Sequence, residues 1–295
     1  MNKYLLDTKS TTERKIIDLT KYGLSNALIL GKYKYNYAHE QLSDHLHKGI
    51  MEICYCHKGH QVYEVNDKIY NIKGGDVFVT FPDEIHSTGA HPEEKGVLYW
   101  LLIKIPANRQ FFHYSKDDGI TFINTLLNLP QRHFKGSLKI KQILESIIEV
   151  SEKADVMQRL ILENLIISFL IQVCTDANAQ MDAPLRSGNA AKIERFINDH
   201  YKEPLSIETM AEMLHISESR FKSWFKEEFG IPPLEFILRK RINEAKIMMQ
   251  SKPDLNMSVI AYDLGFCSPQ HFATTFKRYT FLSPKKFKDS SAFKI

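Results

Sequence analysis

Four side chains in the first hundred residues have the types and spacing of a metal or small-molecule site. His45 and His47 are separated by one residue, Glu52 follows five residues later, and His86 comes further along the chain. Alternate residues of a strand point the same way, so His45 and His47 are expected on one strand face. If Glu52 and His86 converge on them, three imidazoles and a carboxylate suit Zn²⁺, Fe²⁺, Mn²⁺ or Ni²⁺.

The same four residues can instead line a metal-free pocket, as hydrogen-bonding groups for an organic effector with no cofactor. Tyr55 and Trp100 lie in neighbouring expected strands, and such rings stack on the C–H faces of a sugar, although they also suit a barrel core. A carbohydrate is therefore one candidate effector class. The predicted effector site comprises His45, His47, Glu52, His86, Tyr55 and Trp100, and its first four members are the candidate metal ligands.

A second candidate binding region lies near the C-terminus, where one pattern of apolar and capping residues occurs twice. In each copy, apolar residues recur at intervals of three and four on both sides of a short break, which predicts a helix-turn-helix. Ser217 and Ser268 are the expected N-caps of the second helices, and Gly265 suits a turn with positive φ. The matching pairs are Ala211 with Ala261, Leu214 with Leu264, Ser217 with Ser268, Phe221 with Phe272, Phe225 with Phe276 and Pro233 with Pro284.

The second helix of each copy leaves a polar face outward, and that face suits the major groove of DNA. Arg pairs with guanine, Gln pairs with adenine, and Ala or a Thr methyl contacts the thymine methyl. One such face alone would fit simple solvation as well as DNA binding, but two in tandem favour DNA binding. We expect base contacts from Arg220, Lys222, Gln270, His271 and Thr274, and phosphate contacts from Lys226, Arg241, Lys277 and Arg278. Ser219, Ser223 and Ala273 complete the predicted DNA-binding set.

Residues 234–250 lie between the two copies and are predicted to form one helix. Phe236, Ile237, Ile242, Ala245 and Met249 form its apolar stripe. A helix of about 16 residues is about 24 Å long. It is expected to hold the two second helices about one DNA turn, roughly 34 Å, apart on one side of the duplex.

The N-terminal half reads as short strands separated by tight turns, with Asn66-Asp67 as a hairpin turn and Gly74-Gly75 as another. This pattern indicates a small antiparallel barrel or jelly roll. The expected strands are 27–33, 51–57, 61–65, 68–72, 76–81 and 97–105.

Residues 138–174 are expected to form two antiparallel helices that pack on the barrel. Their surplus apolar face suits a second subunit, and core packing within the chain is the alternative. The polar stretch that follows, broken by Pro and Gly, reads as a linker. The expected fold class is α+β, and the expected division is a sensing domain at 1–135, the helical pair at 136–176, a linker at 177–190 and a tandem helix-turn-helix domain at 191–295.

The charge distribution agrees with this division. The chain has 295 residues and a net charge of +4. Residues 185–295 contain 18 Lys and Arg against 13 Asp and Glu, a net charge of +5, so the rest of the chain carries −1. The positive charge thus lies where phosphate binding is expected. We expect no signal peptide or membrane span, and the four cysteines show no disulfide spacing, so a reducing cytoplasm is expected.

Residues 193–288 resemble the DNA-binding domain of the AraC/XylS family of bacterial transcription factors. The resemblance rests on Pro204-Leu-Ser, Arg241-Ile-Asn-Glu-Ala245, Gly265-Phe266 and Ser283-Pro284, together with the paired residues above. The spacing from His45 to His86 resembles the first cupin motif and the shorter second motif of the sensor barrel in that family. One departure is Phe281, which stands where the family has a second Gly matching Gly230. Because positive φ is costly for a bulky residue, the second recognition helix is expected to end differently from the first.

The resemblance implies a two-domain transcription regulator rather than an enzyme. A cupin-like barrel would sense a small molecule, a homodimer would form, and an activator of this kind would contact RNA polymerase as well as double-stranded DNA. Effector binding would shift the population of domain arrangements and so change DNA affinity. Two alternatives stay open: a metal-dependent cupin enzyme fused to a DNA-binding domain, and an effector-independent dimeric regulator.

Overall fold

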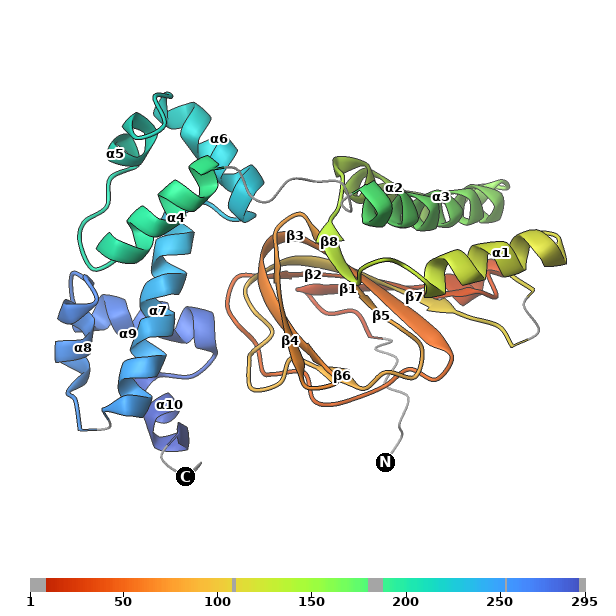
Figure 1. The fold of residues 1–295 in the computed structure, drawn as a ribbon. Coiled ribbons are helices and arrows are strands. Elements are labelled where there is room, and N and C mark those ends of the chain that lie inside the picture. The colour runs from red at the N-terminus through yellow and green to blue at the C-terminus, as the bar shows by residue number, and fades with distance from the viewer. Residues whose placement is uncertain (1–8, 108–109, 180–187, 253, 292–295) are drawn as a thin grey trace. The chain divides into compact units, whose positions relative to one another are not determined.

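The computed structural model describes residues 9–107, 110–179, 188–252 and 254–291. The chain divides into two compact units (Figure 1). The first unit contains the β-sheet and helices α1 to α3, and the second contains helices α4 to α10. The expected α+β class, with a strand-rich N-terminal half and an all-α C-terminal part, is confirmed.

The first unit is built on an antiparallel sheet of eight strands, ordered β1-β2-β7-β3-β5-β8, with β4 and β6 also paired to β3. The long strand β3 merges two expected strands, because a register shift between Cys56 and Lys58 lets it continue past Gly59. The hairpin at Asn66-Asp67 has positive φ at both residues, as such turns require. The strands are β1 Arg14–Asp18, β2 Ala27–Tyr35, β3 Ile50–Val65, β4 Lys68–Lys73, β5 Asp76–Thr80, β6 His86–Ser87, β7 Gly96–Lys104 and β8 His133–Lys135.

Side chains of this sheet form two separate cores because successive residues of a strand point to opposite faces. On one face, Met51, Ile53 and Tyr55 pack with the helices α1 Lys116–Leu127, α2 Leu138–Glu152 and α3 Gln158–Ala179. On the other face, Cys54 and Cys56 pack with rings such as Trp100 and Tyr63 inside the barrel. Figure 1 shows the three helices gathered beside the sheet. The barrel interior is therefore lined by the residues that alternate with Tyr55.

The expected helical pair is present as α2 and α3, but α3 continues to Ala179, so the linker cannot begin at residue 177. Residues 180–187 of the expected linker lie outside the described residues. Helix α1 and strand β1 were not predicted. α3 is long and apolar enough to cross a membrane by length and composition alone, which is weak evidence. Its residues Ile166, Phe169 and Leu170 are buried in the core of the first unit, as expected for a core helix of a globular domain.

The second unit repeats one supersecondary motif. Its two apolar clusters centre on Phe221 and Phe225 in the first copy and on Phe272 and Phe276 in the second. The expected linker helix is α7, which packs into both clusters through Ile237 and Ile242. The helices are α4 Gly188–His200, α5 Ile207–Glu212, α6 Glu218–Phe229, α7 Pro233–Ser251, α8 Met257–Asp263, α9 Pro269–Thr280 and α10 Pro284–Ser291.

The ends of the recognition helices α6 and α9 are fixed in the same way. The Ser217 hydroxyl accepts a hydrogen bond from the backbone N–H of Arg220, and the Ser268 hydroxyl accepts one from His271. At the C-termini, Gly230 has φ 74° and Phe281 has φ 66°, both left-handed. The expectation that α9 would end differently is therefore wrong. Phe281 adopts the backbone conformation of its glycine counterpart and bears the associated strain.

Replacing Phe281 by glycine is expected to stabilise the protein. The left-handed conformation costs a residue with a side chain about 1–2 kcal/mol, and the Phe281 side chain is 44% exposed, so little burial is lost. We expect the free energy of unfolding to rise by about 0.5–1 kcal/mol, measured by urea denaturation of the full chain. The matched control is Gly230→Ala, which should lower it. A lower stability of Phe281→Gly would contradict the assignment of strain.

Candidate DNA-binding helices and barrel site

The two recognition helices expose the faces that the sequence assigned to DNA. All of the assigned side chains on α6 and α9 are exposed. Lys222 forms an ion pair with Glu218 one turn earlier, and the His271 ring lies 3.2 Å from the Cys267 sulfur. The exposed residues are Ser219, Arg220, Lys222, Ser223 and Lys226 on α6 and Gln270, His271, Ala273, Thr274, Lys277 and Arg278 on α9.

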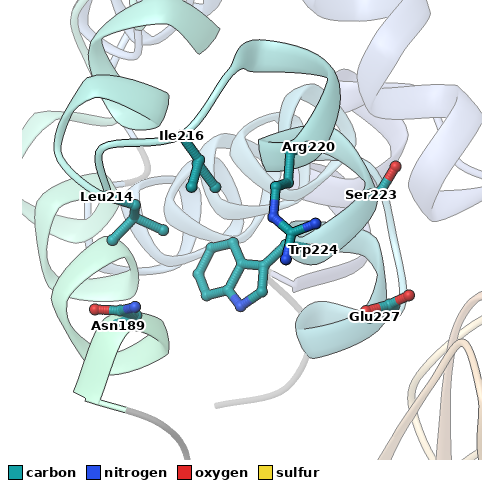
Figure 2. Close-up of a pocket in the computed structure, with 7 residues that line it drawn as sticks. All are labelled: Asn189, Leu214, Ile216, Arg220, Ser223, Trp224 and Glu227. Carbon is teal, nitrogen blue, oxygen red and sulfur yellow. The ribbon is translucent and has the colours of Figure 1, made fainter.

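A pocket of about 300 Å³ lies beside α6 in the first helix-turn-helix. Figure 2 shows the Arg220 side chain extending along the pocket toward the Trp224 indole. Leu214 and Ile216 form the apolar wall on the other side, and Asn189 lies at its rim. Arg220 and Ser223 therefore line a hollow as well as the exposed face of α6, so a partner that reaches them meets a concave surface.

In the first unit the structure brings together the four residues with metal-site spacing. The histidine–glutamate cluster consists of His45, His47, Glu52 and His86, and one ligand atom from each lies within 4.8 Å of all the others. The Glu52 Oε2 atom is 2.9 Å from His86 Nε2 and 3.6 Å from His47 Nε2. Two imidazoles thus approach one carboxylate oxygen, and the His45 ring completes the group within 4.8 Å.

The four members of the cluster come from three separate pieces of backbone. Glu52 belongs to β3 and His86 to β6. His45 and His47 precede β3 and belong to no named strand, so the expected strand face for them is wrong. An isolated bridge instead pairs His45 with His86 through two backbone hydrogen bonds of 3.1 and 2.9 Å. This bridge fixes the two rings side by side, with centroids 4.1 Å apart.

Burial and hydrogen bonding oppose each other at the cluster. Burial alone would raise the pKa of Glu52, but hydrogen bonds from His47 and His86 outweigh it and hold that pKa below its ordinary value. Burial would lower the pKa of His86, and its contact with Glu52 raises it instead. For His45, burial and the neighbouring His86 lower the pKa. The site therefore keeps an ionised carboxylate among imidazoles of unequal basicity.

Comparisons with known proteins cover both units. Residues 32–170 match the family model described as AraC-like ligand binding domain, and residues 210–290 match the model described as Helix-turn-helix domain. The chain belongs to the AraC family of transcriptional regulators.

Curated relatives of this AraC-family regulator align over most of its length. It is 23% identical over 244 residues to the Arabinose operon regulatory protein of Escherichia coli strain K12, covering 81% of this chain and 80% of that one. It is 22% identical over 262 residues to the uncharacterized HTH-type transcriptional regulator YisR of Bacillus subtilis strain 168, covering 83% and 88%.

Solved structures also match the regulator. ToxT from Vibrio cholerae is 13% identical, with a TM-score of 0.35, over 94% of this chain and 98% of that chain. The DNA-binding domain of AdpA, in complex with a target DNA, is 24% identical, with a TM-score of 0.34, over 35% of this chain and 93% of that chain.

Arg241 of the regulator has contacts that differ from the expected phosphate contact. Its Nε donates to the Tyr201 carbonyl at 2.6 Å, its Nη1 to Gly265 at 2.7 Å and its Nη2 to Glu203 at 2.8 Å. Tyr201 and Glu203 follow α4 in the first half of the domain, whereas Gly265 forms the turn of the second helix-turn-helix. Arg241 therefore joins the two halves, and this structural role replaces the predicted phosphate contact.

Two residues assigned to the effector site lie elsewhere. Tyr55 points to the opposite face of β3 from Glu52 and packs in the core beneath the helices, so its assignment is wrong. Trp100 lies inside the barrel, but it is only 7% exposed and packs near Tyr33 with the Arg14 guanidinium over its ring, which makes it a core residue.

Sequence reasoning missed Cys54 as a neighbour of the cluster. Its sulfur lies 3.7 Å from Glu52 Oε1 and 3.4 Å from the Tyr63 hydroxyl. The Cys54 sulfur thus lies beside Oε1 of Glu52, whereas Oε2 is the oxygen nearest His47 and His86. The signal was available, because Cys54 is two residues after Glu52 on the same strand and must share its face.

Proposed function

We propose that the regulator binds DNA by inserting α6 and α9 into two successive major grooves on one side of the duplex. The observation that carries this proposal is the equivalence of the two helices. Each has 12 residues, begins at a serine N-cap and exposes a polar face beside a buried pair of phenylalanines. Helix α7 joins the two motifs with 19 residues, about 28 Å, a length comparable with one DNA turn of about 34 Å.

Base readout is assigned to Arg220, Lys222, Gln270, His271 and Thr274, and phosphate contacts to Lys226, Lys277 and Arg278. Arg, Gln and the Thr methyl suit base edges, whereas Lys acts on phosphate mainly as a point charge. Ser219, Ser223 and Ala273 share these faces and fit short contacts to the sugar-phosphate backbone or a thymine methyl.

Replacing Arg220 by alanine is expected to weaken binding to the selected operator by about 1–3 kcal/mol and to relax specificity at one base pair. The operator is first obtained by selection from a random duplex pool with the full chain. Affinities for the operator and its single-base variants are then compared by fluorescence anisotropy. The matched control is Lys226→Ala on the same helix, which should weaken all sequences alike. Uniform weakening by Arg220→Ala would contradict base readout.

The sensing role is assigned to the barrel, with the histidine–glutamate cluster as the effector-binding site. Its support is a group of three histidines and one glutamate whose ligand atoms lie close together beside the apolar and aromatic core of the barrel. An effector that prefers one arrangement of the two units shifts DNA affinity through linkage. A carbohydrate is one effector class to test, since one relative is named for an arabinose operon.

Self-association is assigned to the apolar surface of α3. Leu160, Ile161 and Ile171 are 51%, 39% and 51% exposed although α3 is otherwise a core helix. Exposed apolar side chains of this kind fit a symmetric contact with a second copy, and twofold dimers bind two DNA half-sites. A regulator that responds to no effector would still use this surface.

The proposal places the protein in the cytoplasm as a regulator without enzymatic activity, contacting RNA polymerase when it activates. One relative is named an operon regulatory protein and another a transcriptional regulator, which supports this choice over a metal-dependent cupin enzyme fused to a DNA-binding domain. An enzyme would turn over a substrate in the absence of DNA, whereas a regulator changes only its DNA affinity when its ligand binds.

A further inference from the structure

We propose that the barrel binds a divalent first-row transition-metal ion between His45, His47, Glu52 and His86. This inference rests on the proposal that the histidine–glutamate cluster is the binding site of the barrel, and it names the ligand of that site. The donor set is three imidazole nitrogens and one carboxylate oxygen, which suits Zn²⁺, Fe²⁺, Mn²⁺, Co²⁺ or Ni²⁺.

The separation of the four ligand atoms fits one ion. Ligands at about 2.1 Å from a metal lie about 3.4 Å apart in a tetrahedron and up to about 4.2 Å apart across an octahedron. In the cluster all four atoms lie within 4.8 Å of one another, and Glu52 Oε2 is 3.6 Å from His47 Nε2. The 4.8 Å limit is only about 0.6 Å above the largest ligand separation at one octahedral ion, a difference that side-chain rotation can close.

Two of the histidines are already oriented as metal ligands. The Nδ1 of His45 lies 2.9 Å from the Ser43 carbonyl, and the Nδ1 of His86 lies 3.1 Å from the Glu84 carbonyl. A carbonyl only accepts, so Nδ1 carries the proton, and in the neutral ring Nε2 keeps its lone pair. Metal-binding histidines are commonly fixed in this way by a backbone carbonyl on the other ring nitrogen.

The number of histidines exceeds what an ion pair needs. One protonated imidazole neutralises Glu52, and His86 at 2.9 Å is placed to do so. His45 and His47 are then not needed to balance the charge of Glu52, although His47 also donates a hydrogen bond to it. A divalent ion would use all three imidazoles together with the carboxylate as ligands.

The four members of the cluster differ in burial. The side chains of His86, His47 and Glu52 are only 1%, 6% and 13% exposed, whereas His45 is partly exposed. A carboxylate at this depth requires a countercharge, which either protonated His86 or a bound ion supplies. Within the described parts of the chain no second group of three or more such ligands occurs. His133 and Asp76 of the same barrel form only a single pair, at 2.8 Å.

The test uses the full chain without a histidine tag, since a tag would itself bind metal. The purified protein is dialysed against metal-free buffer and analysed by plasma mass spectrometry. We expect about one transition-metal ion per chain, and less than a tenth of that in Glu52→Gln and in His47→Gln. The matched control is His133→Gln, which removes a histidine paired with a carboxylate in the same barrel and should keep the ion.

A second measurement distinguishes absence of a metal site from loss of metal during purification and from misfolding of a variant. Chelator-treated wild-type protein is titrated with Co²⁺, whose visible absorption reports binding by protein ligands. Circular dichroism of each variant checks its fold. Removing one ligand should weaken Co²⁺ binding by more than about 100-fold, since loss of an outer-sphere partner alone costs about 10–100-fold. Wild-type protein that neither contains metal nor binds Co²⁺, or variants that bind it equally well, would overturn the inference.

Neither measurement involves DNA, so a negative result leaves the proposed DNA contacts of α6 and α9 intact. Conversely, a chain that binds the ion but no operator would overturn the proposed function while the metal site stands.

Discussion

Replacing Gly265 by alanine is expected to destabilise the DNA-binding unit by about 3 kcal/mol or more. Gly265 has φ +76°, where a residue with a side chain loses about 1–2 kcal/mol. An added Cβ would also lie 2.1 Å from the Lys202 carbonyl oxygen, a backbone atom that cannot rotate away. The two halves of the domain would have to separate at this point, so operator binding should fall together with stability.

The measurement is urea denaturation of the full chain, followed by operator affinity at a temperature where each variant is folded. The matched control is Gly188→Ala at the start of α4, where an added Cβ meets nothing within 4 Å. This control should change stability by less than about 0.5 kcal/mol, as surface substitutions usually do. A Gly265→Ala protein of wild-type stability would mean that the turn does not adopt the described backbone.

The tandem motif could be predicted from the sequence because its signals are local. Ser217 and Ser268 lie directly before the helices that they cap, and Gly265 lies within the turn that needs it. The first copy uses His215 with φ 55° at the equivalent turn position. Because the pattern occurs twice, each copy supports the structural interpretation of the other.

The sensor unit was less predictable because its contacts are distant in sequence. Helix α1 carries Gly119 and several Thr, Asn and Asp residues, so its composition gave little helical signal. Alternation along β3 separated Tyr55 from Glu52, yet only the packed structure shows that the Tyr55 face lies beneath helices. His86 reaches the cluster through pairing with His45, 41 positions earlier, which spacing could suggest but not establish.

The role of Arg241 in the second unit also depends on contacts that are distant in sequence. Arg241 follows Arg239 and Lys240 on a predicted helix, and three neighbouring cations indicate a face that is solvated or binds phosphate. Its acceptors are backbone carbonyls 24 to 40 residues away, and carbonyls have no signature in the sequence. Burial lowers the pKa of Arg241, as expected for a cation withdrawn from water.

Replacing Arg241 by methionine is expected to lower the free energy of unfolding by about 2–4 kcal/mol. Three hydrogen bonds from a charged group are lost, and the carbonyls of Tyr201, Glu203 and Gly265 lose their donor. Methionine keeps much of the side-chain length, so the loss reports the hydrogen bonds rather than packing. Arg241→Lys should recover little of it, since one ammonium cannot reach three acceptors in the plane of the guanidinium.

Salt dependence separates this role from a phosphate contact. Under conditions where Arg241→Met is folded, the slope of log affinity for the operator against log salt should equal that of the wild type, because no phosphate contact is removed. The contrasting variant is Lys277→Met on the exposed face of α9, which should reduce that slope by about 1 and leave stability unchanged. If Arg241→Met instead reduced the slope and kept full stability, Arg241 would bind DNA rather than join the two halves of the domain.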